Sequence, residues 1–266
     1  MKKIILINNV ILLISLIVIS SYFIYKQLKE ENEQESIFDD LCEIIQEDEK
    51  NQAEDNLTAN RDINLEDLYN QNNDLFGWIK MDDINIDYPV MQTKNNEEYY
   101  LHRNFYKEYS SYGTPFISAS YNKDSSENMI IYGHHMNNMK MFGVLEKYKS
   151  VEFYNKHKII KFYTLNDTQE YEIFSVFKTT LYQENSFKYY QNIELDTEAG
   201  YNNFINNCIS RSFYNTGIKP EYKNKLLTLS TCEYSAKNSR LVVVGVLKEN
   251  LYWLEVQIDV ENKRKS

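Results

Sequence analysis

The residues whose types suggest chemistry lie in "LLTLSTCEYSAKNSRLVVVGVL", residues 226–247, where one cysteine and one arginine stand among aliphatic residues. Side chains alternate along a strand, so Leu227 and Leu229 point to one side while Ser230 and Cys232 point to the other. The leucine side can fill a core. The opposite side is small and polar, as the floor of a groove would be, and Cys232 ends the strand on that side.

Arg240 begins the next apolar run, eight residues after Cys232. If the two runs pair antiparallel through the loop at 233–239, Cys232 and Arg240 lie nearly opposite each other, with β-carbons about 5 Å apart. A guanidinium there would lower the pKa of the thiol and donate hydrogen bonds to the oxyanion that forms when a thiolate attacks a carbonyl. The alternative is a small buried cysteine and a rim arginine that pairs with Glu233.

A cysteine nucleophile also needs a partner that gives a proton to the leaving amine. His134 ends an apolar run and shares a strand face with Tyr132, whereas the adjacent His135 points the other way. Two neighbouring histidines that point apart do not form a zinc site, and no carboxylate or cysteine spacing supports one. The remaining histidines, His102 and His157, lie in polar contexts away from a strand end.

The order of these residues along the chain argues against a papain-like protease. His134 precedes Cys232 by 98 residues, whereas papain-like enzymes place the cysteine first and the histidine far downstream.

The elements that must position these residues are mainly strands. Eight short apolar or alternating runs within about 170 residues predict a barrel or a sandwich. The runs are GWIKM, IDYPVMQ, TPFISAS, NMIIYGHH, KIIKFYTL, EYEIFSVFKTTLY, LLTLSTC and RLVVVGVL. Helical spacing of apolar residues predicts helices at 65–72, 141–148 and 198–213.

The start of the chain predicts a membrane anchor. Lys2 and Lys3 precede an apolar run from Ile4 to Tyr25, whose 22 residues rise about 33 Å as a helix, enough to cross a bilayer. No small-residue cleavage site stands out, which favours an uncleaved signal anchor over a cleaved signal peptide. The lysines then stay in the cytoplasm, and the rest of the chain lies outside the cell.

An acidic segment follows the anchor. Residues 29–55 contain 12 acidic side chains and two lysines, which accounts for the whole net charge of −10. We interpret residues 27–60 as a solvated stalk, with a short amphipathic helix at Ile37, Leu41 and Ile45, and residues 61–266 as the catalytic domain. The remainder is balanced in charge, so no surface for nucleic acid is predicted.

The chain has three cysteines, an odd number for an exported domain. Cys42 lies in the acidic segment, Cys208 in a predicted helix and Cys232 at the strand end. At least one thiol is left over from any disulfide pairing, and a free exported thiol calls for a chemical explanation.

Taken together, these residues resemble a sortase, a membrane-anchored cysteine transpeptidase of Gram-positive cell surfaces. The resemblance rests on Thr-Leu-Ser-Thr-Cys ending at Cys232, on Arg240 in the next strand and on Tyr-Gly-His ending at His134. The opening strand pair "GWIKMDDINIDYPVMQ", the segment "MIIYGHHMNNMKMF" and the helix at 198–213 are similar to class B members. The resemblance covers roughly residues 62–250.

The resemblance implies an eight-stranded closed β-barrel with flanking helices. It makes Cys232 the nucleophile, His134 the general acid and base, and Arg240 the group that binds the substrate carbonyl and stabilises the oxyanion.

Four further positions are implied as substrate-binding: Ser230, Tyr132, Asn96 and Glu233. The implied substrate is a secreted protein with a C-terminal sorting signal of the Asn-Pro-x-Thr type or a related Pro-x-Thr motif, cut after threonine. The implied acceptor is an amine of a cell-wall peptide, and no cofactor or metal is expected.

Two alternatives remain from the sequence alone. One is a membrane-tethered binding module that uses the same barrel without catalysis. The other is a cell-wall transpeptidase of the L,D type, although such enzymes favour a compact motif with histidine, cysteine and arginine close together.

Overall fold

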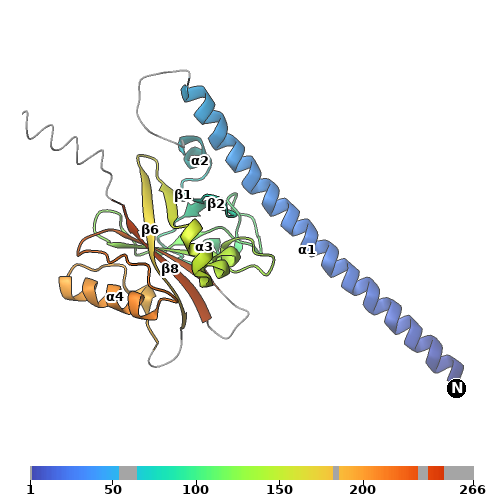
Figure 1. Ribbon diagram of the computed structural model, residues 1–266. Helices are drawn as coiled ribbons and strands as arrows, with labels where there is room; N and C mark the ends of the chain where they lie inside the picture. The colour runs from blue at the N-terminus through green and yellow to red at the C-terminus, as the bar shows by residue number, and fades with distance from the viewer. Residues whose placement is uncertain (1, 54–64, 182–185, 233–238, 249–266) are drawn as a thin grey trace, which may run out of the picture.

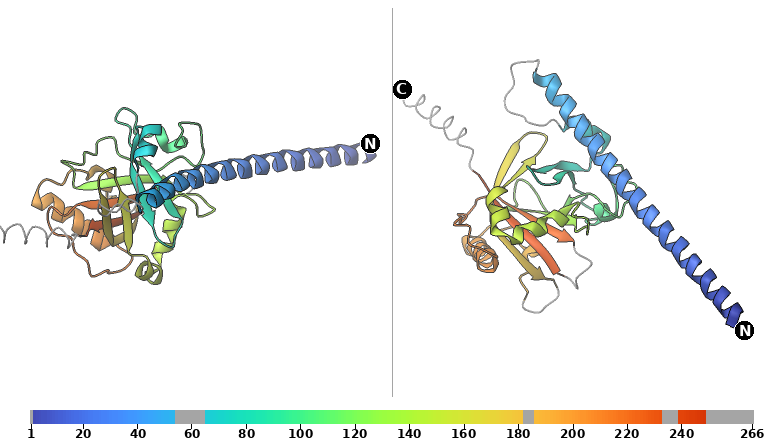
Figure 2. Two further views of the ribbon diagram at one scale, coloured as in Figure 1. Left: turned by 90° about the horizontal axis from the view of Figure 1, so that it is seen from above. Right: turned by 45° about the vertical axis from the view of Figure 1, so that its right-hand side comes forward.

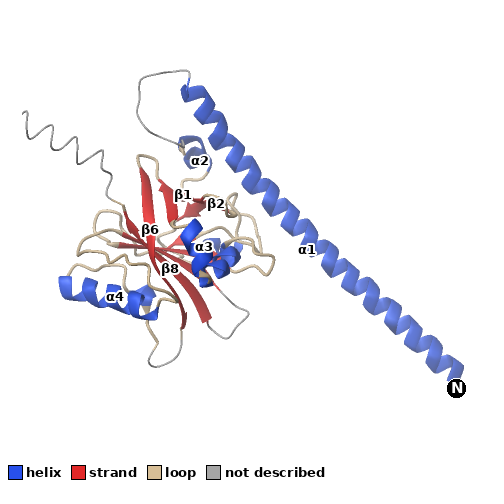
Figure 3. Ribbon diagram, in the orientation of Figure 1, coloured by secondary structure: helices blue, strands red, loops and turns tan. Residues whose placement is uncertain are grey.

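The computed structural model describes residues 2–53, 65–181, 186–232 and 239–248 (Figure 1). Within these residues eight strands close into a barrel in the order β1-β2-β3-β4-β7-β8-β6-β5, and helices lie around it (Figure 3). The predicted closed barrel with flanking helices is therefore confirmed. The loop at 233–238 and the tail from residue 249 lie outside the described residues.

The strands are β1 (Leu75–Met81), β2 (Ile86–Met91), β3 (Phe116–Ile117), β4 (Asn128–His134), β5 (Ile159–Tyr163), β6 (Thr168–Thr180), β7 (Leu226–Cys232) and β8 (Ser239–Leu247). The α-helices are α1 (Lys2–Ala53), α2 (Glu66–Gln71), α3 (Val151–Lys156) and α4 (Glu198–Arg211). Three 3₁₀ segments complete the described elements: η1 (Tyr99–His102), η2 (Phe142–Lys149) and η3 (Tyr189–Gln191).

All eight predicted strand runs form strands, with two differences among the other elements. The helix expected at 141–148 is the 3₁₀ segment η2, and the six-residue helix α3 was not predicted. Helix α3 begins where the side chain of Ser150 accepts a hydrogen bond from the backbone N–H of Phe153, which is an ordinary N-cap.

The strands β4, β7 and β8 carry a hydrophobic cluster on each face. Their inward side chains, such as Ile131, Leu229 and Val243, fill the barrel. Their outward side chains, such as Ile130 and Val242, pack beneath helix α4 and the rest of the connection from β6 to β7. Fully burying each such side chain stabilises the fold by about 1.5–3 kcal/mol, so these three strands are held firmly from both sides.

Strand pairing decides which strand ends meet. Strand β4 pairs with β7 in parallel over its whole length, from Asn128 opposite Leu226 to His134 opposite Cys232. Strand β7 pairs with β8 antiparallel, as predicted, with Ser230 opposite Val242. The C-terminal ends of β4 and β7 therefore lie beside the N-terminal end of β8.

Helix α1 is continuous from the apolar run through the acidic segment. It is the described helix that is long and apolar enough to cross a membrane, and its apolar part is fully exposed in the structure. Figure 2 shows this part projecting beyond the barrel while the later part runs alongside it. The acidic segment thus differs from the solvated stalk expected from its charge, because Phe38, Leu41 and Ile45 are buried against the domain.

Gly133 directly precedes His134 and has no room for a side chain. A β-carbon at this position would lie 2.7 Å from the ring of the fully buried Phe142. We expect Gly133→Ala to lower the free energy of unfolding by about 1–3 kcal/mol through overpacking, measured by urea titration. Gly217→Ala is the control, since nothing lies within 4 Å of that position and only its φ of 77° costs about 1 kcal/mol. A loss below about 1 kcal/mol in Gly133→Ala would contradict the close packing against Phe142.

Candidate active site

The parallel pairing of β4 and β7 brings the predicted histidine and cysteine together. His134 and Cys232 are the last register partners of the two strands, and neighbouring strands lie about 4.8 Å apart. Alternation places His134 on the outer face of β4, with Ile130 and Tyr132, and the outer face of the neighbouring β7 carries Thr228 and Ser230. The backbone of Cys232 is described as the end of β7, and its side chain is outside the described part of the structure.

Arg240 lies at the start of β8, on the same outer face as Val242 and Val244. The β7–β8 register ends at Ser230 and Val242, and the backbone N–H of Leu241 donates to the side chain of Thr231 at 3.0 Å, so Arg240 lies close to the end of β7 just beyond the paired stretch. The guanidinium is half-buried, and its Nη1 donates to the carbonyl oxygen of Ser239 at 3.1 Å. A fixed positive charge therefore stands at the strand end where the thiol is attached.

His134 is buried, and one of its ring nitrogens has a defined partner. Its Nε2 lies 2.6 Å from the backbone oxygen of Leu101. A carbonyl oxygen only accepts hydrogen bonds, so Nε2 carries a proton, and Nδ1 is the nitrogen that gains or loses one. Burial lowers the pKa of His134, while the hydrogen bond to Leu101 opposes that shift because it favours the imidazolium.

No sequence pattern indicated that His102 lies near this site. Its ring centroid lies 5.4 Å from that of His134, and His102 ends the 3₁₀ segment η1 that also supplies Leu101. When His102 is charged it repels a charge on His134, and this also lowers the pKa of His134. Leu101 and His102 are thus the neighbours of His134 that sequence reasoning missed.

The polar face of β7 is covered in this structure. Ser230 is fully buried, and its hydroxyl lies 2.6 Å from the phenol oxygen of Tyr189. Thr228 donates to the side chain of Asn128 at 2.8 Å. The expected floor of a groove therefore lies beneath the connection from β6 to β7, whose apolar residues pack there. Tyr132 remains half-buried on the same face.

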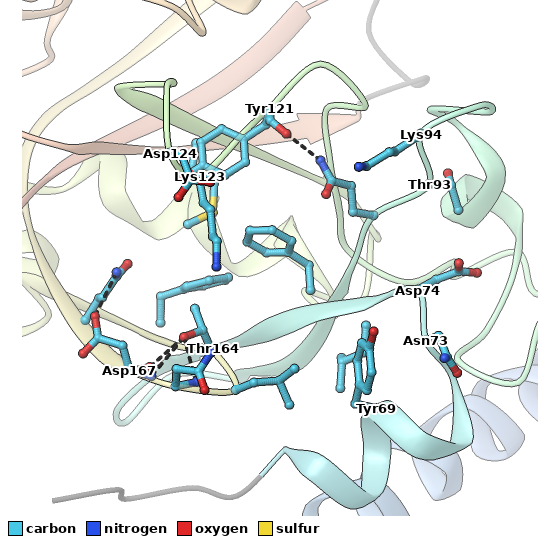
Figure 4. A pocket seen from close by; sticks show the side chains of 18 of the residues that line it. Tyr69, Asn73, Asp74, Thr93, Lys94, Tyr121, Lys123, Asp124, Thr164 and Asp167 are labelled. Atoms are coloured by element: carbon cyan, nitrogen blue, oxygen red, sulfur yellow. Dashed lines mark hydrogen bonds between the residues drawn. The ribbon is translucent and has the colours of Figure 1, made fainter.

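Asn96 lies elsewhere, in the lining of a hollow of about 930 Å³. Figure 4 shows this hollow, where Tyr121 and Lys123 lie near Asp124 and the backbone oxygen of Tyr121 accepts a hydrogen bond from Gln92.

This hollow lies at the opposite end of the strands from the histidine. Its lining includes Met129 near the start of β4 and Lys225 just before β7. Five residues of extended strand, about 16 Å, separate Met129 from His134. The hollow is therefore separate from the strand ends that carry His134 and Arg240.

Glu233 lies outside the described residues. Cys208 is fully buried in α4, and burial raises the pKa of its thiol well above the ordinary value, so this group stays protonated and unreactive.

Comparison with known proteins identifies the family to which this fold belongs. Residues 79–248 match the sortase domain family. Sortase B of Staphylococcus aureus is 35% identical over 184 residues, which cover 68% of this chain and 73% of that protein. The chain belongs to the class B sortases.

Further relatives agree with this sortase assignment. Sortase B of Listeria monocytogenes is 32% identical over 231 residues, covering 86% of this chain and 90% of that protein. A solved structure, the Staphylococcus aureus sortase B–substrate complex, matches with a TM-score of 0.64 at 34% identity and covers 70% of this chain and 84% of that one.

Membership of this family gives the class of reaction. Sortases are cysteine transpeptidases that act at the cell surface, on substrate proteins with sorting signals and on a cell-wall amine acceptor. Family membership therefore decides against both an L,D-type transpeptidase and a non-catalytic binding module.

The contact between the rings of His102 and His134 leads to a prediction about the pKa of His134. We expect His102→Gln to raise the pKa of His134, because it removes a positive charge that disfavours the imidazolium. NMR titration of the His134 ring in a Cys232→Ala background measures this pKa. His157→Gln is the control, since that ring packs against Phe153 instead. An unchanged or lowered pKa in His102→Gln would refute the proposed repulsion.

Proposed function

We propose that this sortase uses Cys232, His134 and Arg240 to cut a sorting signal of the Asn-Pro-x-Thr type, or a related Pro-x-Thr motif, after threonine. It then joins the cut protein to an amine of a cell-wall peptide. The observation that carries the proposal is the register of the parallel strands, which pairs His134 with Cys232. The position of Arg240 on the adjoining strand end supports it.

The first half of the reaction forms a thioester. Nδ1 of His134 takes the proton of the Cys232 thiol, and the sulfur attacks the threonine carbonyl carbon, while Arg240 stabilises the negative charge that develops on the carbonyl oxygen. The peptide C–N bond then breaks, and the leaving nitrogen takes a proton from Nδ1 of His134. The carbonyl of Leu101 holds the ring by Nε2 during this transfer, so the ring need not turn to exchange its proton.

The second half transfers the acyl group. The acceptor amine attacks the thioester carbon, His134 takes a proton from the attacking nitrogen, and the C–S bond breaks to free Cys232. The product is an amide between the threonine and the cell-wall peptide. A thioester suits this two-step reaction because it keeps the acyl group reactive until an amine arrives.

Substrate binding is assigned to Ser230, Tyr132, Asn96 and Glu233. Because Ser230 is bonded to Tyr189 and fully buried, a peptide reaches it only when Tyr189 moves aside. Asn96 lines the hollow at the other end of the strands, so it lies farthest from the reacting atoms among these residues.

The apolar part of helix α1 is proposed as a single membrane span with Lys2 and Lys3 in the cytoplasm and the barrel outside. Substrate and acceptor both reach the outer side of the membrane, so a tethered enzyme meets them at high effective concentration.

Peptide cleavage and transfer test the assigned nucleophile. We expect the full chain in detergent to cut fluorogenic peptides varied around Pro-x-Thr, and to form an amide when a cell-wall peptide amine is added. Cys232→Ala should abolish both reactions, because no other group holds the acyl chain. Cys208→Ala should keep them, since that thiol is buried in α4. Measurable transfer by Cys232→Ala would overturn the proposal.

Replacing Arg240 tests whether charge alone is enough at its position. We expect Arg240→Lys to lower kcat about 10²–10³-fold, because one ammonium does not reproduce the planar fork of the guanidinium. Steady-state kinetics on the best peptide measure this loss, and thermal unfolding verifies that the barrel is intact. Near-normal turnover would show that Arg240 acts only through its charge.

A further inference from the structure

Helix α1 is attached to the barrel by an apolar contact. Phe38, Leu41 and Ile45 lie on one face of the helix and are buried in the same cluster as the barrel interior. The Phe38 ring lies 4.8 Å from that of Tyr88 on β2. These contacts fix the height and rotation of the helix, so the residues one or two turns earlier meet defined parts of the domain.

The preceding turn of α1 forms hydrogen bonds with Ser110 and Ser111. These residues follow Leu101, whose carbonyl is the partner of His134, in the chain. A carboxylate oxygen of Glu30 accepts from the backbone N–H of Ser111 at 2.7 Å, and the buried Gln34 accepts from the hydroxyl of Ser110 at 2.6 Å. Both acceptors lie on the face of the helix that is turned towards the barrel.

From this attachment a short, rigid path leads to the histidine. The backbone N–H of Ser110 donates to the carbonyl of His102 at 3.1 Å. Gly113, with a φ of 60°, packs so closely on the backbone oxygen of Leu101 that a β-carbon would lie 2.4 Å from it. That same oxygen is the partner of His134 Nε2.

The other side of His134 is also attached to α1. The turn after His135 holds Met139 and Met141 at φ of 63° and 52°, a region that costs free energy for residues other than glycine. Such a turn persists only where its surroundings hold it.

Two side chains of α1 supply that hold. Glu31 accepts from Asn138 at 2.7 Å, and Glu35 accepts from Lys140 at 2.6 Å. Helix α1 therefore holds two segments: residues 110–111, whose neighbours pack on Leu101 and His102, and residues 138–140, which follow His134 in the chain.

We propose that helix α1 is a positioning element for His134: its residues Glu30, Glu31, Gln34 and Glu35 hold the two segments that set the histidine's orientation toward Cys232. This rests on the proposed role of His134 as the proton donor and acceptor. The membrane helix is thereby part of the working enzyme in addition to being its tether.

The same geometry sets how close the site lies to the membrane. Glu30 follows Tyr25, the end of the apolar run, by five positions, and five positions of helix rise about 7.5 Å. Because the helix is unbroken, the clamped end of the barrel is held within about one or two helical turns of the membrane surface.

The test compares two faces of one helical turn in the full chain, in detergent. Glu30→Ala with Gln34→Ala removes the bonds to Ser110 and Ser111, while Asn32→Ala with Glu33→Ala changes neighbouring exposed residues. We expect the first pair to lower kcat about tenfold with little change in KM, because a small misplacement of a catalytic group reduces the rate. The second pair should match the unaltered enzyme. Glu30→Gln, which keeps an acceptor oxygen, should retain most of the activity.

A second readout separates positioning from general loss of structure. In a Cys232→Ala background, the His134 ring resonances should shift in the first pair and stay in place in the second, with both pairs folded by thermal unfolding. Gly113→Ala, which displaces the Leu101 carbonyl from within the domain, should reproduce the kinetic defect. Equal kcat in both pairs, or unmoved His134 resonances, would overturn the positioning role. Full activity of His134→Ala would instead overturn the proposed function itself.

Discussion

The parallel pairing of β4 with β7 is the interaction on which the rest of the site depends. This pairing sets the backbone of His134 beside that of Cys232, and a shift of β4 by one residue would turn the His134 side chain into the barrel interior. Two hydrophobic clusters, one inside the barrel and one beneath the connection from β6 to β7, resist such a shift from opposite faces. The rigidity that catalysis needs at the strand ends thus comes from packing along the whole length of the strands.

Much of the barrel could be predicted from the sequence, because local patterns specify strands well. β7 begins and ends where its alternating run does, and β4 and β8 differ from theirs by one residue. β3 is much shorter than its run, with only Phe116 and Ile117 paired. Helix α3 was not predicted because six residues are too few to show a helical period of apolar residues. Its N-cap, Ser150, was a usable signal for the start of a helix.

The types of the site residues could also be predicted, whereas their neighbours could not. Nothing local states that residue 134 lies beside residue 232, since that pairing joins strands far apart in the sequence. The same holds for Leu101 and His102 at His134, and for Tyr189 over Ser230. The acidic segment was misleading for a different reason: its charges dominate the composition, but the apolar residues at helical spacing decide where it packs.

Closure of the barrel has a consequence for how a peptide is recognised. Over the stretch Leu226–Ser230, β7 has a backbone partner on both sides, β4 on one and β8 on the other, and β8 lies in turn between β7 and β6, so this stretch offers no open edge. A peptide therefore cannot pair with β7 as an additional strand along that stretch. Its sequence is then recognised by side chains and by the connections between strands. Differences in those connections would therefore decide which sorting signal is preferred.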